Sequence, residues 1–357
     1  MVKERILKVQ ALLEENGAML ITGQPNRYYL TGMESSAGMV LITKKNAYFM
    51  IDFRYVEKAK MVVKDCQVRL SSYADQEIGQ LCAQDGAKIL HIEAYEMSVD
   101  RLEQLKAALP QLTLCTDPAM DDAIIAMRSM KTAGELELIK KAQKITDDTF
   151  TYILDRIKPG RTEREVMLDM EFFMRKQPEC QGVSFDFIVV SGKNSSLPHG
   201  VPSDKKIETG DFVTMDFGAI VGGYCSDMTR TVAVGAVSEE QKKVYNTVLQ
   251  AQLAALDVVK AGLVCKDVDK IARDIIYNAG YEGCFGHGLG HSVGIEIHEN
   301  PAFNMRCETV LKPGTVMTVE PGIYLENKFG VRIEDMVYVT DEGSINLTAS
   351  PKELIIL

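Results

Sequence analysis

The residues best suited to chemistry lie in one glycine-spaced stretch, residues 285–299. It holds three of the five histidines of the chain, His287, His291 and His298, with glycines between them. Glycine loses much backbone entropy on folding and has no side chain to pack, so a core strand rarely contains so many. The glycines therefore predict a backbone that comes close to another group. Imidazoles on such a backbone indicate a metal site or a substrate site.

Carboxylates that could join these histidines lie on predicted strands. Side chains alternate along a strand, so Asp216 shares one face of the stretch 212–217 with Thr214, and apolar residues occupy the other face. Glu320 ends the stretch 315–320 in the same way. The apolar faces can pack on helices, which leaves the acidic faces free to line a cleft.

Two further acidic positions follow from the same alternation. Asp227 comes after a Gly-Gly turn at 222–223, so we expect Asp216 and Asp227 to face each other on paired strands. Glu334 shares a face with Arg332 in the next predicted strand. For two other residues, a ligand and an ordinary charged side chain remain equally open interpretations. These two are Asp335 and Glu299.

Such a set of carboxylates needs cations, because several like charges within a few ångströms cannot all ionise. Either the carboxylates are separated and solvated, or metal ions hold them together. With His291 they form a hard, oxygen-rich set that suits a pair of Mn²⁺, Co²⁺ or Zn²⁺ ions. His199, on a predicted turn, is a weaker candidate for the same site, and His91 lies in a strand and is interpreted as structural.

The part of the chain that carries these residues contains an internal repeat. Three sequence pairs recur in the same order about a hundred residues later. Each copy predicts helix, helix, strand, strand, with helices over 133–157 and 161–175, then over 238–259 and 264–278. Each copy also places two carboxylates on its strands. The pairs are Lys158-Pro-Gly160 with Lys260-Ala-Gly262, Asp216-Phe-Gly218 with Glu320-Pro-Gly322, and Asp227-Met228 with Asp335-Met336.

The first part of the chain predicts a small α/β domain, because strands alternate with helices. A helix over 3–16 is expected to stop at Gly17, and Lys44-Lys-Asn46 predicts a hairpin turn. The stretch 117–122 is a plausible boundary, so we expect domains over 1–125 and 126–357. The other expected strands are 18–22, 39–43, 47–51, 67–70, 88–93 and 112–116, and the other expected helices are 54–64, 76–85 and 97–109.

Composition excludes some classes of function. The net charge of −10 argues against a nucleic-acid partner, which would need a basic face. No apolar run reaches the roughly 20 residues that span a bilayer, and the first residues do not resemble a signal peptide. The eight cysteines show no paired spacing, as is typical of reduced cysteines in the cytoplasm. We therefore expect a cytoplasmic protein with no membrane partner.

On these motifs, residues 126–357 resemble the "pita-bread" metallopeptidases of the creatinase–methionine aminopeptidase family. They are most similar to the X-Pro peptidases, aminopeptidase P and prolidase. The first part is similar to the creatinase-like N-terminal domain, so the resemblance implies an α/β (α+β) chain of two domains, the second with a pseudo-twofold repeat. The matching segments are Met215-Asp-Phe-Gly218, Ser226-Asp-Met-Thr-Arg-Thr231, Gly286-His-Gly-Leu-Gly-His-Ser-Val-Gly294, His298-Glu-Asn-Pro301, Val319-Glu-Pro-Gly-Ile-Tyr324, Gly330-Val-Arg-Ile-Glu-Asp335, Asn26-Arg-Tyr-Tyr-Leu-Thr-Gly32 and Asp52-Phe-Arg-Tyr55.

The resemblance implies metal-dependent hydrolysis of the peptide bond before proline, by a hydroxide that bridges two divalent ions. Mn²⁺ is expected first, with Co²⁺ or Zn²⁺ as alternatives. Glu320 is expected to accept and pass on a proton, His298 to contact the carbonyl or oxyanion, and His287 and His199 to contact the substrate near proline. Supporting roles beside the ligands fall on Arg332, Thr229 and Tyr324. The implied metal ligands are Asp216, Asp227, His291, Glu320 and Glu334.

Several alternatives stay open. The motifs do not separate an aminopeptidase, which acts on longer peptides with proline in second position, from a dipeptidase. Relatives that lack metal ligands act as creatinase-type hydrolases or as non-catalytic binding proteins, but all five positions here carry side chains able to bind metal. The resemblance also implies a homodimer in which the N-terminal domain completes the substrate cleft and makes dimer contacts.

Overall fold

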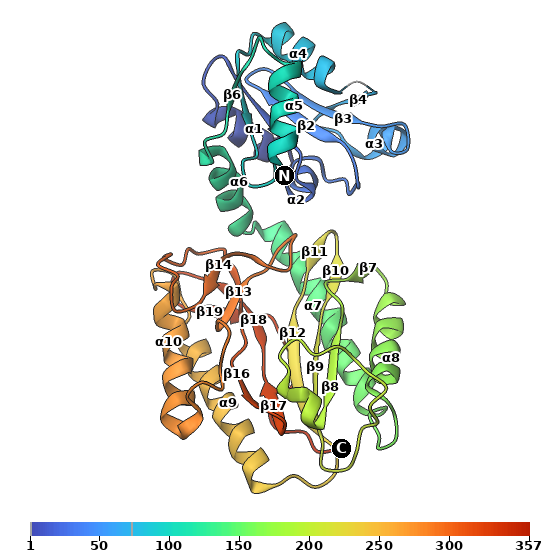
Figure 1. Ribbon diagram of the computed structural model, residues 1–357, viewed down its shortest axis with the longest axis vertical. Helices are drawn as coiled ribbons and strands as arrows, with labels where there is room; N and C mark the ends of the chain where they lie inside the picture. The colour runs from blue at the N-terminus through green and yellow to red at the C-terminus, as the bar shows by residue number, and fades with distance from the viewer. Residues whose placement is uncertain (1, 73) are drawn as a thin grey trace. The chain divides into compact units, whose positions relative to one another are not determined.

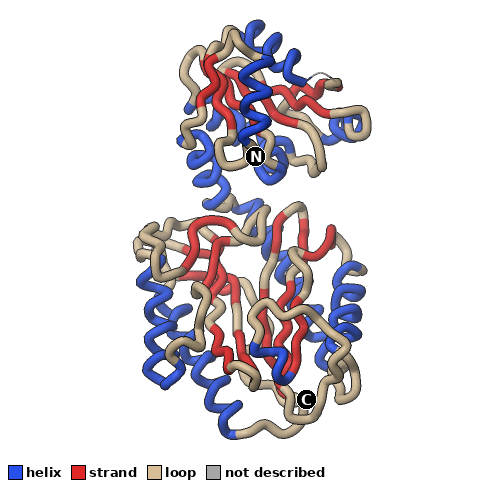
Figure 2. The backbone as a smooth tube through the Cα atoms, viewed as in Figure 1, coloured by secondary structure: helices blue, strands red, loops and turns tan. Residues whose placement is uncertain are grey.

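The computed structural model describes residues 2–72 and 74–357, which form two compact units. The first unit extends to Arg128 and the second runs from Ser129 to Leu357. Figures 1 and 2 show that each unit has strands packed against helices. Within the described residues, no helix is long and apolar enough to cross a membrane.

The first unit is an α/β domain, as predicted, and its strands form one mixed sheet. Its strand order is β4-β3-β2-β1-β5-β6. The predicted hairpin is present, because β2 pairs antiparallel with β3. The strands are β1 (Gly17–Ile21), β2 (Met39–Thr43), β3 (Ala47–Ile51), β4 (Gln67–Leu70), β5 (Ile89–Ile92) and β6 (Thr113–Cys115), and the helices are α1 (Val2–Leu12), α2 (Gln24–Thr31), α3 (Val56–Val62), α4 (Ala74–Asp85), α5 (Val99–Ala108) and α6 (Ala119–Ser129).

In this unit, the predicted end of the first helix was wrong, and one helix was not predicted. The first helix ends at Leu12, and Gly17 begins β1 instead of stopping the helix. Helix α2 was not predicted, because it is short and polar on average. Its signals are nevertheless present in the sequence. Pro25 occupies the first turn, where its missing N–H costs nothing, and Gly32 caps the end with a φ of 69°.

The second unit shows the predicted repeat of elements. Two long helices precede the paired strands in each half. In the first half β9 pairs antiparallel with β12, and in the second half β15 pairs antiparallel with β18. The first half contains α7 (Ala133–Leu154), α8 (Glu163–Arg175), β7 (Cys180–Val183), β8 (Ile188–Ser191), β9 (Phe212–Phe217), β10 (Ala219–Val221), β11 (Tyr224–Cys225) and β12 (Met228–Ala233). The second contains α9 (Glu239–Val258), α10 (Cys265–Ile276), β13 (Gly290–Ser292), β14 (Glu299–Phe303), β15 (Val316–Val319), β16 (Gly322–Leu325), β17 (Phe329–Arg332), β18 (Asp335–Val339) and β19 (Ser344–Asn346). Single turns of helix also lie at η1 (Gly192–Ser196) and η2 (Tyr277–Tyr281).

In the second unit, the helices lie on the outer sides of the strands, so the two layers of strands face each other (Figure 1). On β9, Met215 and Phe217 are fully buried in a core with residues of α7 and α8. On β15, Met317 and Val319 are fully buried in a second core with residues of α9 and α10. Truncating one such side chain to alanine typically costs about 2–5 kcal/mol. Because the apolar faces of both strands point outward to helices, the polar faces point into the space between the layers.

The prediction that Asp216 and Asp227 face each other on paired strands was wrong. Asp216 lies opposite Thr229, and Asp227 precedes the first residue of β12. The Gly-Gly turn at 222–223 joins β10 to β11, which belong to a different sheet. Where the chain passes from one sheet to the other, Gly218 permits close approach of the Ser226 backbone, since a Cβ on Gly218 would lie 1.8 Å from the Ser226 carbonyl oxygen. Asp227 therefore occupies a bend, next to the strand pair.

Candidate metal centre

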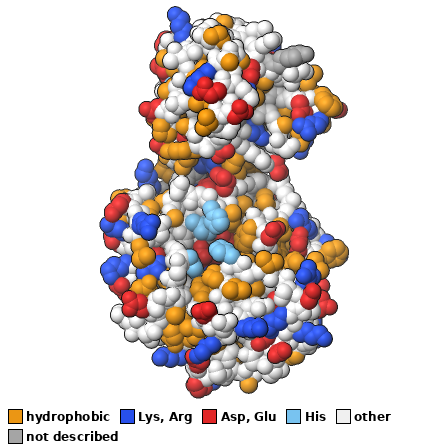
Figure 3. All heavy atoms as spheres, viewed as in Figure 1, with side chains coloured by type: hydrophobic (Ala, Val, Ile, Leu, Met, Phe, Trp, Pro, Cys, Tyr) orange, Lys and Arg blue, Asp and Glu red, His pale blue; other side chains and the backbone are white. Residues whose placement is uncertain are grey.

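A cavity of about 720 Å³ lies in the second unit, and the predicted histidines and carboxylates meet there. Figure 3 shows histidine and acidic side chains gathered in a hollow on this face of the unit. Apolar side chains line another part of the wall, among them Phe185, Phe187 and Ile188. Nine of the residues singled out from the sequence line the cavity: His199, Asp216, Asp227, His287, His291, His298, Glu320, Arg332 and Glu334.

The four carboxylates reach this cavity from both halves of the repeat. Asp216 comes from β9, and Asp227 from the bend before β12. Glu320 follows the last residue of β15, and Glu334 lies between β17 and β18. Asp227 and Glu334 are buried, and Asp216 and Glu320 are partly exposed toward the cavity. The repeat thus brings together carboxylates that are about a hundred residues apart in sequence.

Three oxygens of these carboxylates fit a bound cation. Asp216 Oδ1, Asp227 Oδ1 and Glu334 Oε1 are buried, and none has a hydrogen-bond donor among the described residues. A buried charged oxygen without a partner is costly, so nearly all such groups in proteins are paired or bind metal. One oxygen atom of Asp227, one of Glu334 and one nitrogen of His291 all lie within 4.8 Å of each other. This donor set suits a hard divalent ion.

The electrostatics of the cluster agree with this interpretation. Burial raises the pKa of Glu320 to about 8. Burial, together with the neighbouring carboxylates, also raises the pKa values of Asp227 and Glu334 well above their usual range. Without a bound metal ion, the carboxyl groups of Asp227, Glu320 and Glu334 therefore favour their protonated forms. A divalent cation would replace those protons.

His291 is oriented so that one ring nitrogen faces the carboxylates. Its Nδ1 lies 3.1 Å from the Ser292 carbonyl oxygen, which places a proton on Nδ1. Its Nε2 then has a free lone pair, 3.4 Å from Glu320 Oε1 and 3.6 Å from Asp227 Oδ2. The Thr318 hydroxyl accepts a hydrogen bond from the backbone N–H of His291 and donates one to Glu320. Burial lowers the pKa of His291 to about 4, so the ring is neutral and able to bind metal.

Arg332, Thr229 and Tyr324, for which supporting roles were expected, form hydrogen bonds with or next to the carboxylates. Arg332 Nη2 donates to Asp216 Oδ2 at 2.6 Å, and Arg332 Nε donates to the Thr229 hydroxyl at 3.0 Å. That hydroxyl in turn donates to Glu334 Oε2 at 2.7 Å. Arg332 Nη1 donates to the Tyr324 hydroxyl at 2.9 Å. One guanidinium therefore fixes the orientation of two candidate ligands, Asp216 directly and Glu334 through Thr229.

The remaining histidines differ in their surroundings. The ring of His298 lies edge-on to that of His291, with 4.4 Å between centroids. His287 Nε2 lies 2.8 Å from the Tyr324 hydroxyl, and its Nδ1 lies 2.8 Å from the Gly288 carbonyl oxygen. Burial lowers the pKa of His287 to about 4, so this ring is neutral. His91 contacts Glu14 within the first unit.

The glycines of the 285–299 stretch permit close approach to backbone. A Cβ on Gly290 would lie 2.1 Å from the Thr318 carbonyl oxygen, and one on Gly288 would lie 2.6 Å from the Phe303 carbonyl oxygen. At Gly286 a Cβ would meet nothing within 4 Å. The sequence predicted that another group comes close to these glycines. At Gly288 and Gly290 that group is the backbone of a neighbouring strand.

The two carboxylates whose role was open from the sequence lie outside the cluster. Asp335 forms an ion pair with Arg230 at 2.7 Å and is fully buried. Glu299 forms an ion pair with Lys131 at 2.9 Å. Neither carboxylate lines the cavity. Each of these two carboxylates therefore belongs to a structural ion pair.

One supporting pair was missed in the sequence. Asp269 and Arg273, one turn apart on α10, are buried and bonded to each other. Arg273 donates to the carbonyl oxygens of Phe285 and His287, and Asp269 accepts from the backbone N–H of Leu289. The pair thus holds the histidine stretch in place. Its signal was an acidic and a basic residue four apart beside the apolar stripe of a predicted helix.

The fold and the site together define a metallopeptidase with a creatinase-type N-terminal domain. The Creatinase/Prolidase N-terminal domain matches residues 5–128, and metallopeptidase family M24 matches residues 137–341. The chain belongs to metallopeptidase family M24.

Relatives cover nearly the whole chain. The uncharacterized peptidase YqhT of Bacillus subtilis is 43% identical, over 95% of both chains. An Xaa-Pro dipeptidase structure from Bacillus anthracis is 42% identical with a TM-score of 0.95 and covers 100% of both chains. An X-Pro aminopeptidase structure from Thermotoga maritima is 36% identical with a TM-score of 0.91, covering 98% of this chain and 100% of the other. These relatives favour a peptidase over a metal-free creatinase-type hydrolase or a non-catalytic binding protein.

Proposed function

We propose that this protein hydrolyses the peptide bond that precedes proline, in a reaction that depends on divalent metal. The observation that carries the proposal is the set of three buried carboxylate oxygens without donors, on Asp216, Asp227 and Glu334, beside a neutral His291. The names of the similar Bacillus anthracis and Thermotoga maritima proteins supply the preference for proline. The apolar wall of the cavity is suited to a proline ring.

Five side chains are proposed to hold two divalent ions. Mn²⁺ is expected first and Co²⁺ or Zn²⁺ as alternatives, because oxygen-rich sites accept all three and availability decides. Such ions, when bound, polarise the scissile carbonyl group and lower the pKa of a water molecule to near neutrality. The five proposed ligands are Asp216, Asp227, His291, Glu320 and Glu334.

The surrounding residues are proposed to orient the peptide and move protons. Glu320 lines the cavity and accepts a hydrogen bond from the Thr318 hydroxyl, and its carboxylate can take a proton and pass it to the leaving nitrogen. His298 lies beside the candidate ligand His291 and can donate to the developing oxyanion. His287 and His199 line the cavity and can contact the substrate near proline. Tyr324 holds the ring of His287 in place.

By resemblance, we also propose a homodimer in which the first domain, over about residues 1–125, contributes to the cleft of the neighbouring subunit's catalytic domain. A cytoplasmic location is proposed from the eight free cysteines, which reducing compartments preserve.

A peptide panel tests the proposal and separates its two forms. The purified protein is assayed on an Xaa-Pro dipeptide, on Xaa-Pro-Yaa-Zaa, and on the matched peptides with alanine in place of proline. We expect cleavage before proline only. Cleavage confined to the dipeptide defines a dipeptidase, and cleavage of the longer peptide defines an aminopeptidase. Equal cleavage of the alanine peptides contradicts the proposed specificity.

A further inference from the structure

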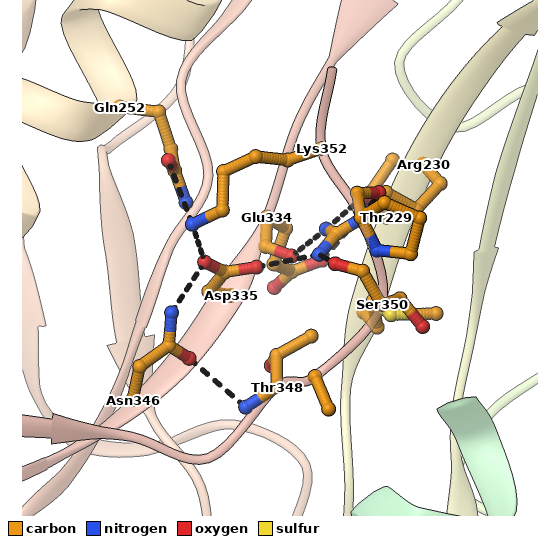
Figure 4. Close-up of polar contacts among 12 residues, drawn as sticks. Thr229, Arg230, Gln252, Glu334, Asp335, Asn346, Thr348, Ser350 and Lys352 are labelled. Carbon is orange, nitrogen blue, oxygen red and sulfur yellow. Dashed lines mark hydrogen bonds and ion pairs between the residues drawn. The ribbon is translucent and has the colours of Figure 1, made fainter. Parts of the chain in front are cut away.

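A second charged cluster lies next to the candidate metal ligand Glu334 (Figure 4). It consists of Arg230, Asp335 and Lys352. The side chains of Arg230 and Asp335 are 1% and 0% exposed, and Lys352 is 17% exposed. Asp335 accepts from Arg230 at 2.7 Å through one oxygen and from Lys352 and Asn346 through the other. Two cations therefore flank one buried carboxylate.

Every N–H of the Arg230 guanidinium has an acceptor. Nε donates to the Pro351 carbonyl oxygen at 2.9 Å, and Nη2 donates to Asp335 and to the Ser350 carbonyl oxygen. Nη1 donates to the carbonyl oxygens of Thr229 at 2.9 Å and Glu334 at 2.5 Å. A guanidinium has five N–H bonds in a rigid plane, and these five contacts use them all. Lysine cannot reproduce this pattern, because its ammonium is a compact group with three donors.

The cluster contacts the metal centre through the backbone of Thr229 and Glu334, whose carbonyl oxygens accept from Arg230. The side chain of Glu334 lines the cavity, and the Thr229 hydroxyl donates a hydrogen bond to its carboxylate. The neighbouring residues, Arg230 and Asp335, point to the opposite side, as alternation along an extended chain requires. The backbone N–H of Glu334 donates to the Thr229 carbonyl oxygen. Arg230 thus holds the two backbone segments that carry this ligand and its hydrogen-bond donor.

The last residues of the chain complete the cluster. Ser350, Pro351 and Lys352 supply three of its contacts. Ser350 is itself anchored on α7, because its backbone N–H and hydroxyl donate to Asp147. The Lys352 carbonyl oxygen accepts from the Tyr245 hydroxyl of α9. The C-terminal segment therefore spans both halves of the repeat and is fixed to a helix of each.

We propose that Arg230, Asp335 and Lys352 are positioning residues that fix Glu334 and so set the affinity of the centre for divalent cations. This inference rests on the proposed function. The candidate ligand comes from a connection between β17 and β18, which pair in different sheets, so no single sheet fixes its backbone. The cluster supplies that constraint from behind. It makes the C-terminal segment part of the metal centre, although none of residues 346–357 lines the cavity.

Two substitutions test the proposal with a readout other than activity. Arg230→Lys keeps the charge and removes part of the hydrogen-bond fork, and Lys352→Met removes the partly exposed cation. The matched control is Lys328→Met, whose ion pair with Glu240 lies on the surface of the same unit. Metal-free protein is titrated with Mn²⁺ in a calorimeter, and folding is checked by circular dichroism and denaturant unfolding. Removal of positioning contacts of this kind typically weakens metal binding about 10–100-fold.

We expect Mn²⁺ to bind at least about tenfold more weakly to Arg230→Lys and to Lys352→Met than to the wild type, while Lys328→Met is unchanged. We also expect saturating Mn²⁺ to restore most of the lost activity. Mn²⁺ affinity within about twofold of wild type in folded Lys352→Met would overturn the inference, whether or not Arg230→Lys folds. If the wild type itself binds no divalent cation, both the inference and the proposed function are overturned. Wild-type binding with unchanged variants overturns the inference alone.

Discussion

Arg332 Nη2 lies 2.6 Å from Asp216 Oδ2, and this ion pair joins β17 of the second half of the repeat to β9 of the first. The guanidinium is 4% exposed and also bonds Thr229 and Tyr324. A planar fork can make these contacts at the same time, whereas an ammonium cannot. The arrangement across the repeat thus depends on arginine at this position.

We predict that Arg332→Lys lowers kcat about 10–100-fold, because Asp216 and Glu334 lose their fixed orientation. Steady-state kinetics on an Xaa-Pro peptide, with metal content measured on the same sample, checks this. Arg164→Lys is the control, since its ion pair with Asp204 is exposed and contributes about 0–1 kcal/mol. Wild-type kinetics for Arg332→Lys would show that the fork has no role at the site.

Substitution of each of the two neighbouring histidines distinguishes a loss of metal binding from a loss of turnover. His298→Ala should reduce kcat about 10²–10³-fold while the metal content stays at the wild-type level, because its proposed role is to donate to the oxyanion. His291→Ala should lose metal, since its Nε2 faces the carboxylates. Elemental analysis of both variants after identical loading with Mn²⁺ decides the assignment. Metal loss in His298→Ala would mean that the two roles are reversed.

Two glycine substitutions test whether close approach to backbone explains the glycines of the 285–299 stretch. Gly290→Ala should destabilise the protein by about 3 kcal/mol, because the new Cβ would lie 2.1 Å from a backbone oxygen that cannot move away. Gly286→Ala should change stability by less than about 0.5 kcal/mol, since its Cβ meets nothing within 4 Å. Denaturant unfolding of the two variants gives the comparison. Equal destabilisation would rule out close backbone approach as the cause.

The raised pKa of Glu320, about 8 through burial, predicts how stability depends on pH. An unfolded glutamate has a pKa of about 4.3, so between about pH 4.5 and pH 8 the folded metal-free protein holds a proton that the unfolded chain has lost. The contribution of Glu320 to the free energy of unfolding therefore falls as pH rises through this window. Mn²⁺ should remove the fall, because the cation takes the place of the proton.

Unfolding by urea at several pH values, with and without saturating Mn²⁺, measures this effect. Glu320→Gln serves as the reference, because its side chain does not titrate. We expect the difference in unfolding free energy between the metal-free wild type and Glu320→Gln to change with pH up to about 8. A difference that is constant over this range would contradict the raised pKa.

The sequence predicted much of this architecture because the strongest signals are local. The alternation around Asp216 correctly placed its apolar neighbours in a helix-packed core, and the repeat predicted the order of the elements. The register of Asp227 was wrong because the Gly-Gly turn at 222–223 joins β10 and β11, which lie in a different sheet from β9 and β12, and alternation does not encode this change of sheet. Site assignments for the histidines remain predictions.

The contacts of Arg230 could not be predicted, because their partners are far apart in the chain. Arg230 bonds Glu334, Asp335 and Ser350, each more than a hundred residues later. Neither charge pattern nor periodicity relates such positions. Asp335 shows the consequence. The sequence left it open as a ligand, whereas the structure pairs it with Arg230 and Lys352, which outweigh the effect of burial and hold its pKa below the usual value.

The most direct test of the account is removal and return of metal. The protein is dialysed against a chelator until elemental analysis finds no divalent ion, and hydrolysis of an Xaa-Pro dipeptide is then measured before and after addition of Mn²⁺ or Co²⁺. We predict that the metal-free protein is inactive and that about two ions per chain restore activity. Full hydrolysis by the metal-free protein would contradict it.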